Sequence, residues 1–203
     1  MIAIIDYGVG NLFSLLSSFK RIGAEAVVTS DKAEIEKADK IILPGVGAFQ
    51  DAAKKLRESG LDEVVKQQVK KGKLLMGICL GMQLLFEKSF EYGEHEGLGL
   101  IQGKVVPIKG EVDASLKIPQ IGWNALHFTR PHKLFQYIKE GDHAYFVHSY
   151  FATDCAEAVI AMTEYGKQLT AAVAQGNVMG CQFHPEKSGE VGLNILRGFC
   201  ALQ

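Results

Sequence analysis

Short apolar segments alternate with amphipathic segments through the first half of the chain, and this alternation restricts the fold more than any other feature. Apolar residues at helical spacing, beginning with the Leu12, Leu15 and Phe19 stripe, lie between runs that have the length and β-branched content of buried strands. Strands that alternate with helices predict an α/β fold with a mostly parallel central sheet flanked by helices. The predicted strands are Ile2–Ile5, Ala26–Thr29, Lys40–Leu43 and Leu74–Ile78.

The second half of the chain has a different pattern. Strand candidates follow one another from about residue 100 with few helices between them, at 101–108, 123–128, 144–151, 159–163, 169–174 and 178–183. This succession predicts an antiparallel extension of the sheet. No linker rich in proline or serine separates the halves, and 203 residues suit one core. We therefore expect a single domain over 1–203.

Charge and cysteine content exclude several functional classes. The 22 basic and 23 acidic residues leave a net charge of −1, and no basic run exceeds two residues, which argues against nucleic-acid binding. The longest mostly apolar run, 74–86, is too short and too rich in glycine to span a membrane. The four cysteines lack the spacing of a zinc site or disulfide framework. We expect no metal, no cofactor and a cytoplasmic location.

Cys79 has the sequence surroundings of a nucleophile. It lies between Gly77 and Gly81, after a predicted strand and before a helical segment at 80–86, as in the G-x-S-x-G elbow with cysteine in place of serine. Glycines at these two positions let chain segments pass closely at a strained turn. Unpaired amides at a helix start favour a thiolate. A buried structural cysteine between packing glycines is the alternative.

His184 and Glu186 form a second candidate group around Pro185. Residues i and i+2 of an extended segment project to the same side, so the carboxylate can orient the imidazole ring. The ring can then exchange a proton with Cys79, which gives a Cys-His-Glu triad in outline. A charged pair on a surface turn is the alternative explanation, and only the fold decides whether Cys79 and His184 meet.

Acyl chemistry also needs donors for an oxyanion. The Leu80 amide follows the nucleophile, and the Pro44-Gly45-Val46-Gly47 loop offers further N–H groups that side chains do not block. A simple β-to-α turn or a phosphate cradle would have a similar sequence. The loop lacks the Lys-Ser/Thr ending of a P-loop, which disfavours nucleotide binding.

These motifs resemble those of the class I glutamine amidotransferases, which hydrolyse the side-chain amide of glutamine with a Cys-His-Glu triad. Segments 76–83 and 184–186 carry this resemblance, which implies a flavodoxin-like fold. Within the family, the whole chain except 102–118 and 152–175 resembles the glutaminase subunits of imidazole glycerol phosphate synthases, from histidine biosynthesis. The segments that carry this closer resemblance are 6–12, 44–49, 96–100, 119–124, 145–150 and 184–188.

The resemblance implies roles for individual residues. Cys79 would attack L-glutamine, His184 would transfer protons and Glu186 would orient the histidine, while Leu80 and either Val46 or Gly47 would stabilise the oxyanion. Positions that would hold the amino-acid end of glutamine are Gln83, His148, Ser149 and Tyr150. From the residues alone, Gln83 could equally be a helix cap and His148 a strand histidine with satisfied hydrogen bonds.

The resemblance also implies a partner. It is a cyclase subunit of (β/α)8-barrel fold that receives the ammonia, which agrees with a chain length that a glutaminase alone would fill. The residues that would face it are Asn11, Gln120, Trp123, Tyr145, Lys187 and Ser188.

Three other functions compete with this prediction. The chain could be the glutaminase component of an anthranilate or aminodeoxychorismate synthase, although segments 6–12 and 119–124 argue against it. A non-catalytic binding module on the same fold would be expected to lose a triad residue. A cysteine peptidase would leave Gln83 and the His-Pro-Glu spacing unexplained.

Overall fold

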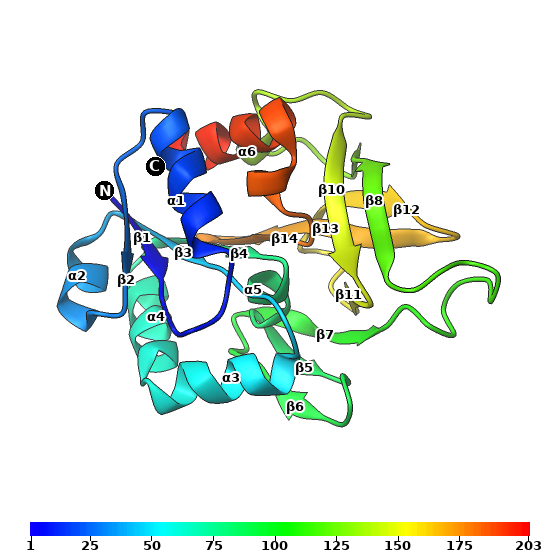
Figure 1. Cartoon of the computed structure of the whole chain (residues 1–203), viewed down its shortest axis with the longest axis horizontal. Helices are drawn as coiled ribbons and strands as arrows, with labels where there is room; N and C mark the ends of the chain where they lie inside the picture. Colours follow the sequence, from blue (N-terminus) through cyan, green and yellow to red (C-terminus); the bar gives the residue numbers. More distant parts are fainter.

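The computed structural model describes residues 1–203, and an eight-stranded sheet runs through its centre (Figure 1). The strands lie in the order β2, β1, β3, β4, β14, β13, β12, β9. Neighbours from β2 to β14 are parallel, whereas β13, β12 and β9 continue the sheet antiparallel. The predicted parallel sheet with an antiparallel extension is therefore confirmed. The strand bounds are β1 Ile2–Ile5, β2 Ala26–Thr29, β3 Lys40–Leu43, β4 Leu74–Ile78, β9 His127–Phe128, β12 Val159–Glu164, β13 Gln168–Gln175 and β14 Val178–Cys181.

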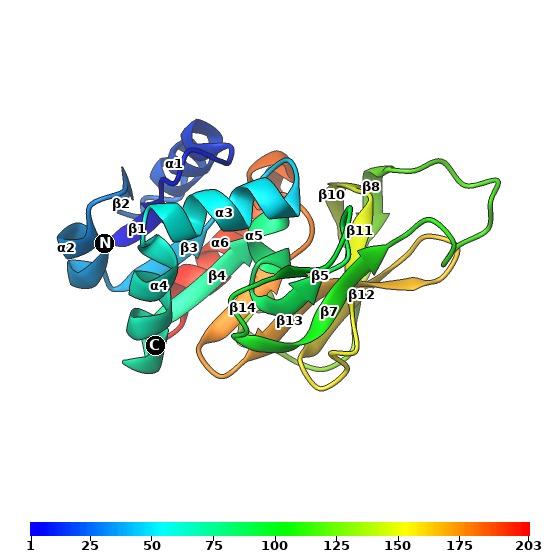
Figure 2. The same ribbon diagram turned by 90° about the horizontal axis from the view of Figure 1, so that it is seen from below.

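Helices cover both faces of the sheet (Figures 1 and 2). Helices α1 (Leu12–Arg21) and α6 (Gly189–Ala201) lie on one face, and α2 (Lys32–Lys37), α3 (Phe49–Glu58) and α4 (Leu61–Lys70) lie on the other. Side chains alternate along each strand, so Ile4 packs toward α1 while Ile5 packs toward α3 and α4.

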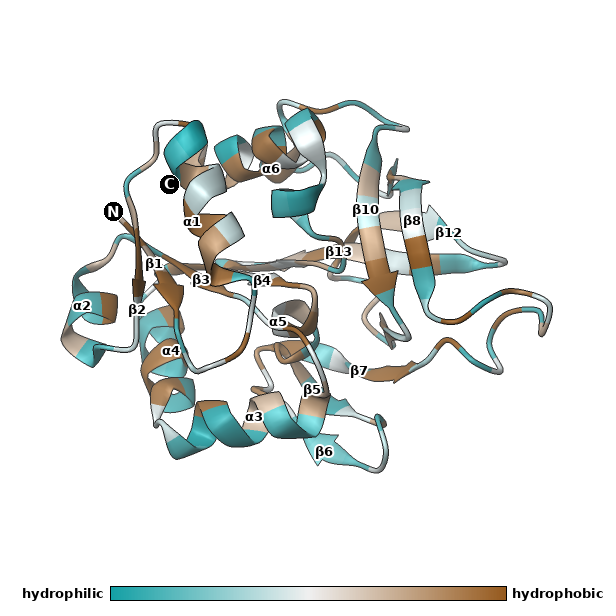
Figure 3. Cartoon of the chain, viewed as in Figure 1, coloured by the Kyte–Doolittle hydropathy of each residue, from teal (hydrophilic) through white to brown (hydrophobic).

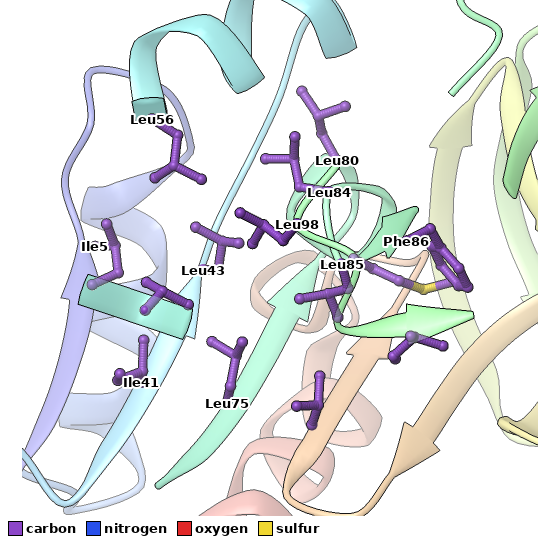
Figure 4. Close-up of a cluster of buried hydrophobic side chains, with 14 of the residues drawn as sticks. Ile5, Ile41, Leu43, Leu56, Leu75, Leu80, Leu84, Leu85, Phe86 and Leu98 are labelled. Atoms are coloured by element: carbon purple, nitrogen blue, oxygen red, sulfur yellow. The ribbon is translucent and has the colours of Figure 1, made fainter. Parts of the chain in front are cut away.

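Two hydrophobic clusters result from this alternation. Figure 4 shows part of the larger one, in which side chains from β1, β3, β4 and α3 meet those that follow Cys79. In Figure 3 the central strands are largely brown, for hydrophobic residues, whereas α3 is largely teal, for hydrophilic ones. None of the helices has the length and apolar content needed to cross a membrane.

Two smaller sheets pack beside the large one, and they correct three predictions. Segment 144–151 is not one strand, because β10 (His143–His148) pairs with β8 (Gln120–Ala125) while β11 (Tyr150–Thr153) pairs with β7 (Ile101–Pro107). Segment 123–128 is likewise divided, between β8 and β9. The helix predicted over 80–86 ends early. It is the short α5 (Leu80–Gln83), and the chain then enters β5 (Phe86–Ser89), which pairs with β7 and β6 (His95–Glu96).

The parallel strands bring the predicted functional segments together. Strands β3, β4 and β14 are neighbours and point the same way, so the loops that follow them share one edge of the sheet. These loops contain Pro44-Gly45-Val46-Gly47, Cys79 and the segment that leads to His184. Ligands of open α/β sheets bind at this carboxyl edge.

Candidate active site

Cys79 occupies a strained turn between β4 and α5. Its φ of 55° and ψ of −113° are unusual for a residue with a side chain. The bracketing glycines permit this turn, because a Cβ on Gly77 would lie 2.5 Å from Gly81 O, and one on Gly81 would overlap the carbonyl oxygen of Leu43 in β3. The sequence therefore forms the nucleophile elbow that its glycine spacing predicts.

The structure brings Cys79, His184 and Glu186 together. His184 Nδ1 lies 2.8 Å from Glu186 Oε1, and both side chains are almost fully buried, with exposed fractions of 3% and 1%. Cys79 also acts on this ring electrostatically. Burial by itself lowers the pKa of His184, but the hydrogen bonds and negative charges of Cys79 and Glu186 outweigh burial and raise this pKa to about 10. These two partners therefore favour the protonated form of the His184 ring.

Hydrogen bonds to β10 hold the His-Pro-Glu turn in place. His184 N donates to Tyr145 O at 2.9 Å, and the Ser188 hydroxyl donates to His184 O at 2.7 Å while it accepts from Tyr145 N at 2.9 Å. Ser188 is 1% exposed. It is therefore a structural support of the histidine, and the prediction that it faces a partner is wrong.

A cavity of about 310 Å³ opens beside the triad. The predicted oxyanion residues Val46, Gly47 and Leu80 border it, together with the nucleophile. The loop that carries Val46 is fixed at its start, where Tyr7 Oη donates to Pro44 O at 2.6 Å, and reaches a left-handed φ of +89° at Gly47. The full lining is Val46, Gly47, Cys79, Leu80, Gln83, Glu91, Pro119, Val147, His148, Ser149, Tyr150, His184 and Lys187.

Comparison with known proteins identifies the family. Residues 3–201 match the family model described as glutamine amidotransferase class-I. The chain belongs to this family. Two relatives named imidazole glycerol phosphate synthase subunit HisH resemble it along its whole length. The protein from Sulfurimonas denitrificans is 51% identical over 98% of this chain and 97% of its own, and that from Oceanobacillus iheyensis is 47% identical over 98% of each chain.

Solved structures share the amidotransferase fold at lower identity. A glutamine amidotransferase crystal structure superposes with a TM-score of 0.76 at 23% identity, over 99% of this chain and all of that one. A chain of PurLQS from Thermotoga maritima gives a TM-score of 0.75 at 21% identity, over 98% and 96% of the two chains. These likenesses establish the fold.

Two residues of the amidotransferase site were not predicted from the sequence, Glu91 and Gln182. Glu91 lines the cavity and accepts a hydrogen bond from Phe49 N at 2.6 Å. Burial raises the pKa of its carboxyl, and the Phe49 amide partly opposes this rise. Nothing in the loop sequence distinguishes Glu91 from its neighbours. The sequence does distinguish Gln182, because it is a polar residue in the otherwise apolar run 178–183.

His148 is a buried neutral histidine of the amidotransferase. Its Nδ1 lies 2.7 Å from Tyr150 O and its Nε2 lies 2.9 Å from the side-chain amide of Gln120. Burial lowers its pKa to about 4, against the opposing effect of the Tyr150 carbonyl. Gln120 is fully buried beneath this ring. The prediction that Gln120 faces a partner is therefore wrong, and its side chain instead fixes His148.

Three of the remaining predicted interface residues lie close to one another. The rings of Trp123 and Tyr145 meet edge to face at 5.9 Å, and Lys187 Nζ lies 5.8 Å from the centre of the Tyr145 ring. Trp123 is 54% exposed and Lys187 is also exposed. Asn11 is half-buried at the start of α1. No group of three or more His, Cys, Asp or Glu side chains is arranged to hold a metal ion.

Proposed function

We propose that this chain is the glutaminase subunit of an imidazole glycerol phosphate synthase. It hydrolyses glutamine to glutamate and ammonia, and a second subunit uses the ammonia to form imidazole glycerol phosphate and aminoimidazole carboxamide ribonucleotide in histidine biosynthesis. The buried Cys79, His184 and Glu186 arrangement beside a cavity carries this proposal. Full-length relatives about half identical to the chain bear the name of this synthase subunit.

The first half of the reaction forms a bond between the Cys79 sulfur and the substrate. The thiolate attacks the carboxamide carbon, and the amide N–H groups of Leu80 and of Val46 or Gly47 stabilise the resulting oxyanion. Formation of the S–C bond removes the negative charge of the thiolate. Because that charge helps to raise the pKa of His184, its loss makes the imidazolium a stronger acid, which donates its proton to the departing ammonia.

The second half of the reaction releases glutamate. The now neutral His184 takes a proton from water as the water attacks the thioester, and the S–C bond breaks to regenerate the thiolate. Glu186 holds the ring throughout by accepting a hydrogen bond from Nδ1–H, with Nδ1 2.8 Å from Oε1. It thereby keeps Nε2 directed at the reacting atoms.

The cavity lining matches the amino-acid end of glutamine. Its volume of about 310 Å³ suits a small substrate, and Glu91 supplies a carboxylate for the α-ammonium group. Ser149 and Tyr150 border the same cavity and can bind the α-carboxylate through their backbone amides. Gln83 and His148 are buried, and their hydrogen bonds to Tyr150 O shape this wall.

Replacing Glu91 with glutamine should raise the KM for glutamine about 30-fold with little change in kcat. The amide still accepts from Phe49 N but loses the charge that binds the ammonium group, which is a contact of about 2 kcal/mol. Steady-state glutaminase kinetics measure this effect. Glu94→Gln is the matched control, since Glu94 is on the same loop but exposed and paired with Lys88. An unchanged KM would exclude Glu91 from substrate binding.

The partner in this proposal is a cyclase subunit of (β/α)8-barrel fold. The proposed docking surface is the face formed by Trp123, Tyr145 and Lys187. Asn11, at the start of α1, is also proposed to face the partner. Its exposed Trp123 ring is of a residue type that is enriched at protein interfaces. The cytoplasmic location remains a prediction from the sequence.

Reconstitution with the cyclase subunit tests the function as a whole. Addition of that subunit with its ribonucleotide substrate should raise the glutaminase rate by orders of magnitude, since the oxyanion loop ends at an open, left-handed Gly47 that a partner can reorient. The large component of an anthranilate synthase is the control and should have no effect. Equal rates with both additions, or no imidazole glycerol phosphate from glutamine, would reject the proposal.

A further inference from the structure

Gln182 contacts the nucleophile, yet the mechanism above gives it no role. Its side chain is fully buried between β14 and His184, and its Nε2 lies 3.7 Å from Cys79 Sγ, within hydrogen-bonding range for sulfur. Gln182 does not line the substrate cavity. Gln182 reaches the site through two side chains, Cys79 and Gln83, and only its contact with Cys79 acts directly on the nucleophile.

A chain of hydrogen bonds fixes which end of the Gln182 amide faces the sulfur. The carbonyl oxygen of Tyr150 can only accept, so the Gln83 group 3.1 Å from it must be its NH₂. That same NH₂ donates at 3.0 Å to the Gln182 side chain, which must present its oxygen there. The NH₂ of Gln182 is then left to face Cys79 Sγ. The Tyr150 carbonyl thus fixes the orientation of the Gln182 amide, through the side chain of Gln83.

We propose that Gln182 is a positioning residue that donates a hydrogen bond to the Cys79 thiolate. A buried thiolate needs donors to replace water, and a protonated His184 ring is one such group beside Cys79. Gln182 supplies a second, neutral donor that titrates at no ordinary pH. Held between the two, the sulfur keeps the position from which it attacks the substrate. The catalytic consequence rests on the proposed glutaminase function, whereas the hydrogen bond does not.

The test is the pH dependence of Cys79 alkylation by iodoacetamide in the full chain. Gln182→Met keeps the side-chain volume but removes the donor, so the midpoint of the rate profile should move up by about one pH unit. The kcat for glutamine should fall about tenfold, with KM changed less than about twofold. Gln182→Glu places a carboxylate beside the thiolate and should move the midpoint further in the same direction.

Two controls separate this role from general destabilisation. Gln68→Met removes another buried glutamine, in α4, whose Nε2 has no hydrogen-bond partner, and should leave the midpoint unchanged. Cys79→Ser supplies the blank for alkylation of the other three cysteines. A merely structural loss would lower the amount of folded protein without moving the midpoint.

An unchanged midpoint in Gln182→Met and Gln182→Glu, at normal thermal stability, would overturn the proposal. If neither variant folds, side-chain amide NMR of the wild-type chain decides, since carboxamidomethylation of Cys79 should shift the Gln182 NH₂ resonances and no shift would contradict the contact. Alkylation needs no glutamine. A chain that lacks glutaminase activity but shows the midpoint shift would therefore reject the proposed function and retain the hydrogen bond.

Discussion

Replacing Cys79 with serine should lower the rate of glutamine hydrolysis by on the order of 10⁴-fold or more. A serine hydroxyl is a much weaker nucleophile than a cysteine thiolate, so the variant loses the reactive sulfur of the triad. It also removes the negative charge that helps to keep His184 protonated, so proton transfer to the departing ammonia is altered at the same time. Initial rates of glutamate release, measured in the complex with the cyclase subunit, test this expectation.

The same variant should leave synthesis from added ammonia intact. The elbow conformation depends on Gly77 and Gly81 and not on the sulfur, so the fold and the docking face persist. Cys181→Ser is the matched control, because Cys181 is also a buried thiol, at the end of β14, but its sulfur donates to Phe183 O and lies outside the substrate cavity. Glutaminase activity in Cys79→Ser within tenfold of wild type would contradict the nucleophile assignment.

The central sheet could be predicted because its strands are distinct in composition. The four apolar runs from Ile2 to Ile78 pair in parallel as expected, since buried parallel strands require such runs. The break between β10 and β11 at Ser149 could not be predicted. The alternation of apolar and polar residues continues through this position, although the chain passes from one sheet to another. Likewise, Leu84 and Leu85 extend the helical apolar pattern after α5, but their tertiary contacts favour an end to the helix before β5.

The triad could be predicted because its chemistry requires fixed local spacing, both around Cys79 and between His184 and Glu186. Glu91 could not, since its place in the cavity depends on how the loop after β5 folds against α3. Residue type also gave no information on the burial of the two residues that were wrongly predicted to face a partner. Gln120 and Ser188 are polar, yet each is buried and bonded to a histidine of the site.

Substitution of alanine for Gly81 should lower the free energy of unfolding by about 4 kcal/mol or more. The new Cβ would overlap the carbonyl of Leu43 and come within 3.1 Å of Pro44 C, and both are backbone atoms that no rotamer change can move. The elbow and the end of β3 would have to separate. Because Pro44 begins the oxyanion loop, this separation should also remove glutaminase activity in any protein that still folds. Urea unfolding and glutamate release measure the two effects.

Gly176→Ala is the matched control for this substitution. Gly176 lies in the turn between β13 and β14 with a φ of +59°, and a Cβ there would meet no atom within 4 Å. Its expected cost is therefore backbone strain alone, about 1 kcal/mol, with activity retained. Gly176→Ala thus tests the need for a positive φ, whereas Gly81→Ala tests the need for close packing of the backbone. If Gly81→Ala unfolds at the same urea concentration as Gly176→Ala, the contact between the elbow and β3 does not require glycine at position 81, and the strained φ of Cys79 must be maintained by other contacts.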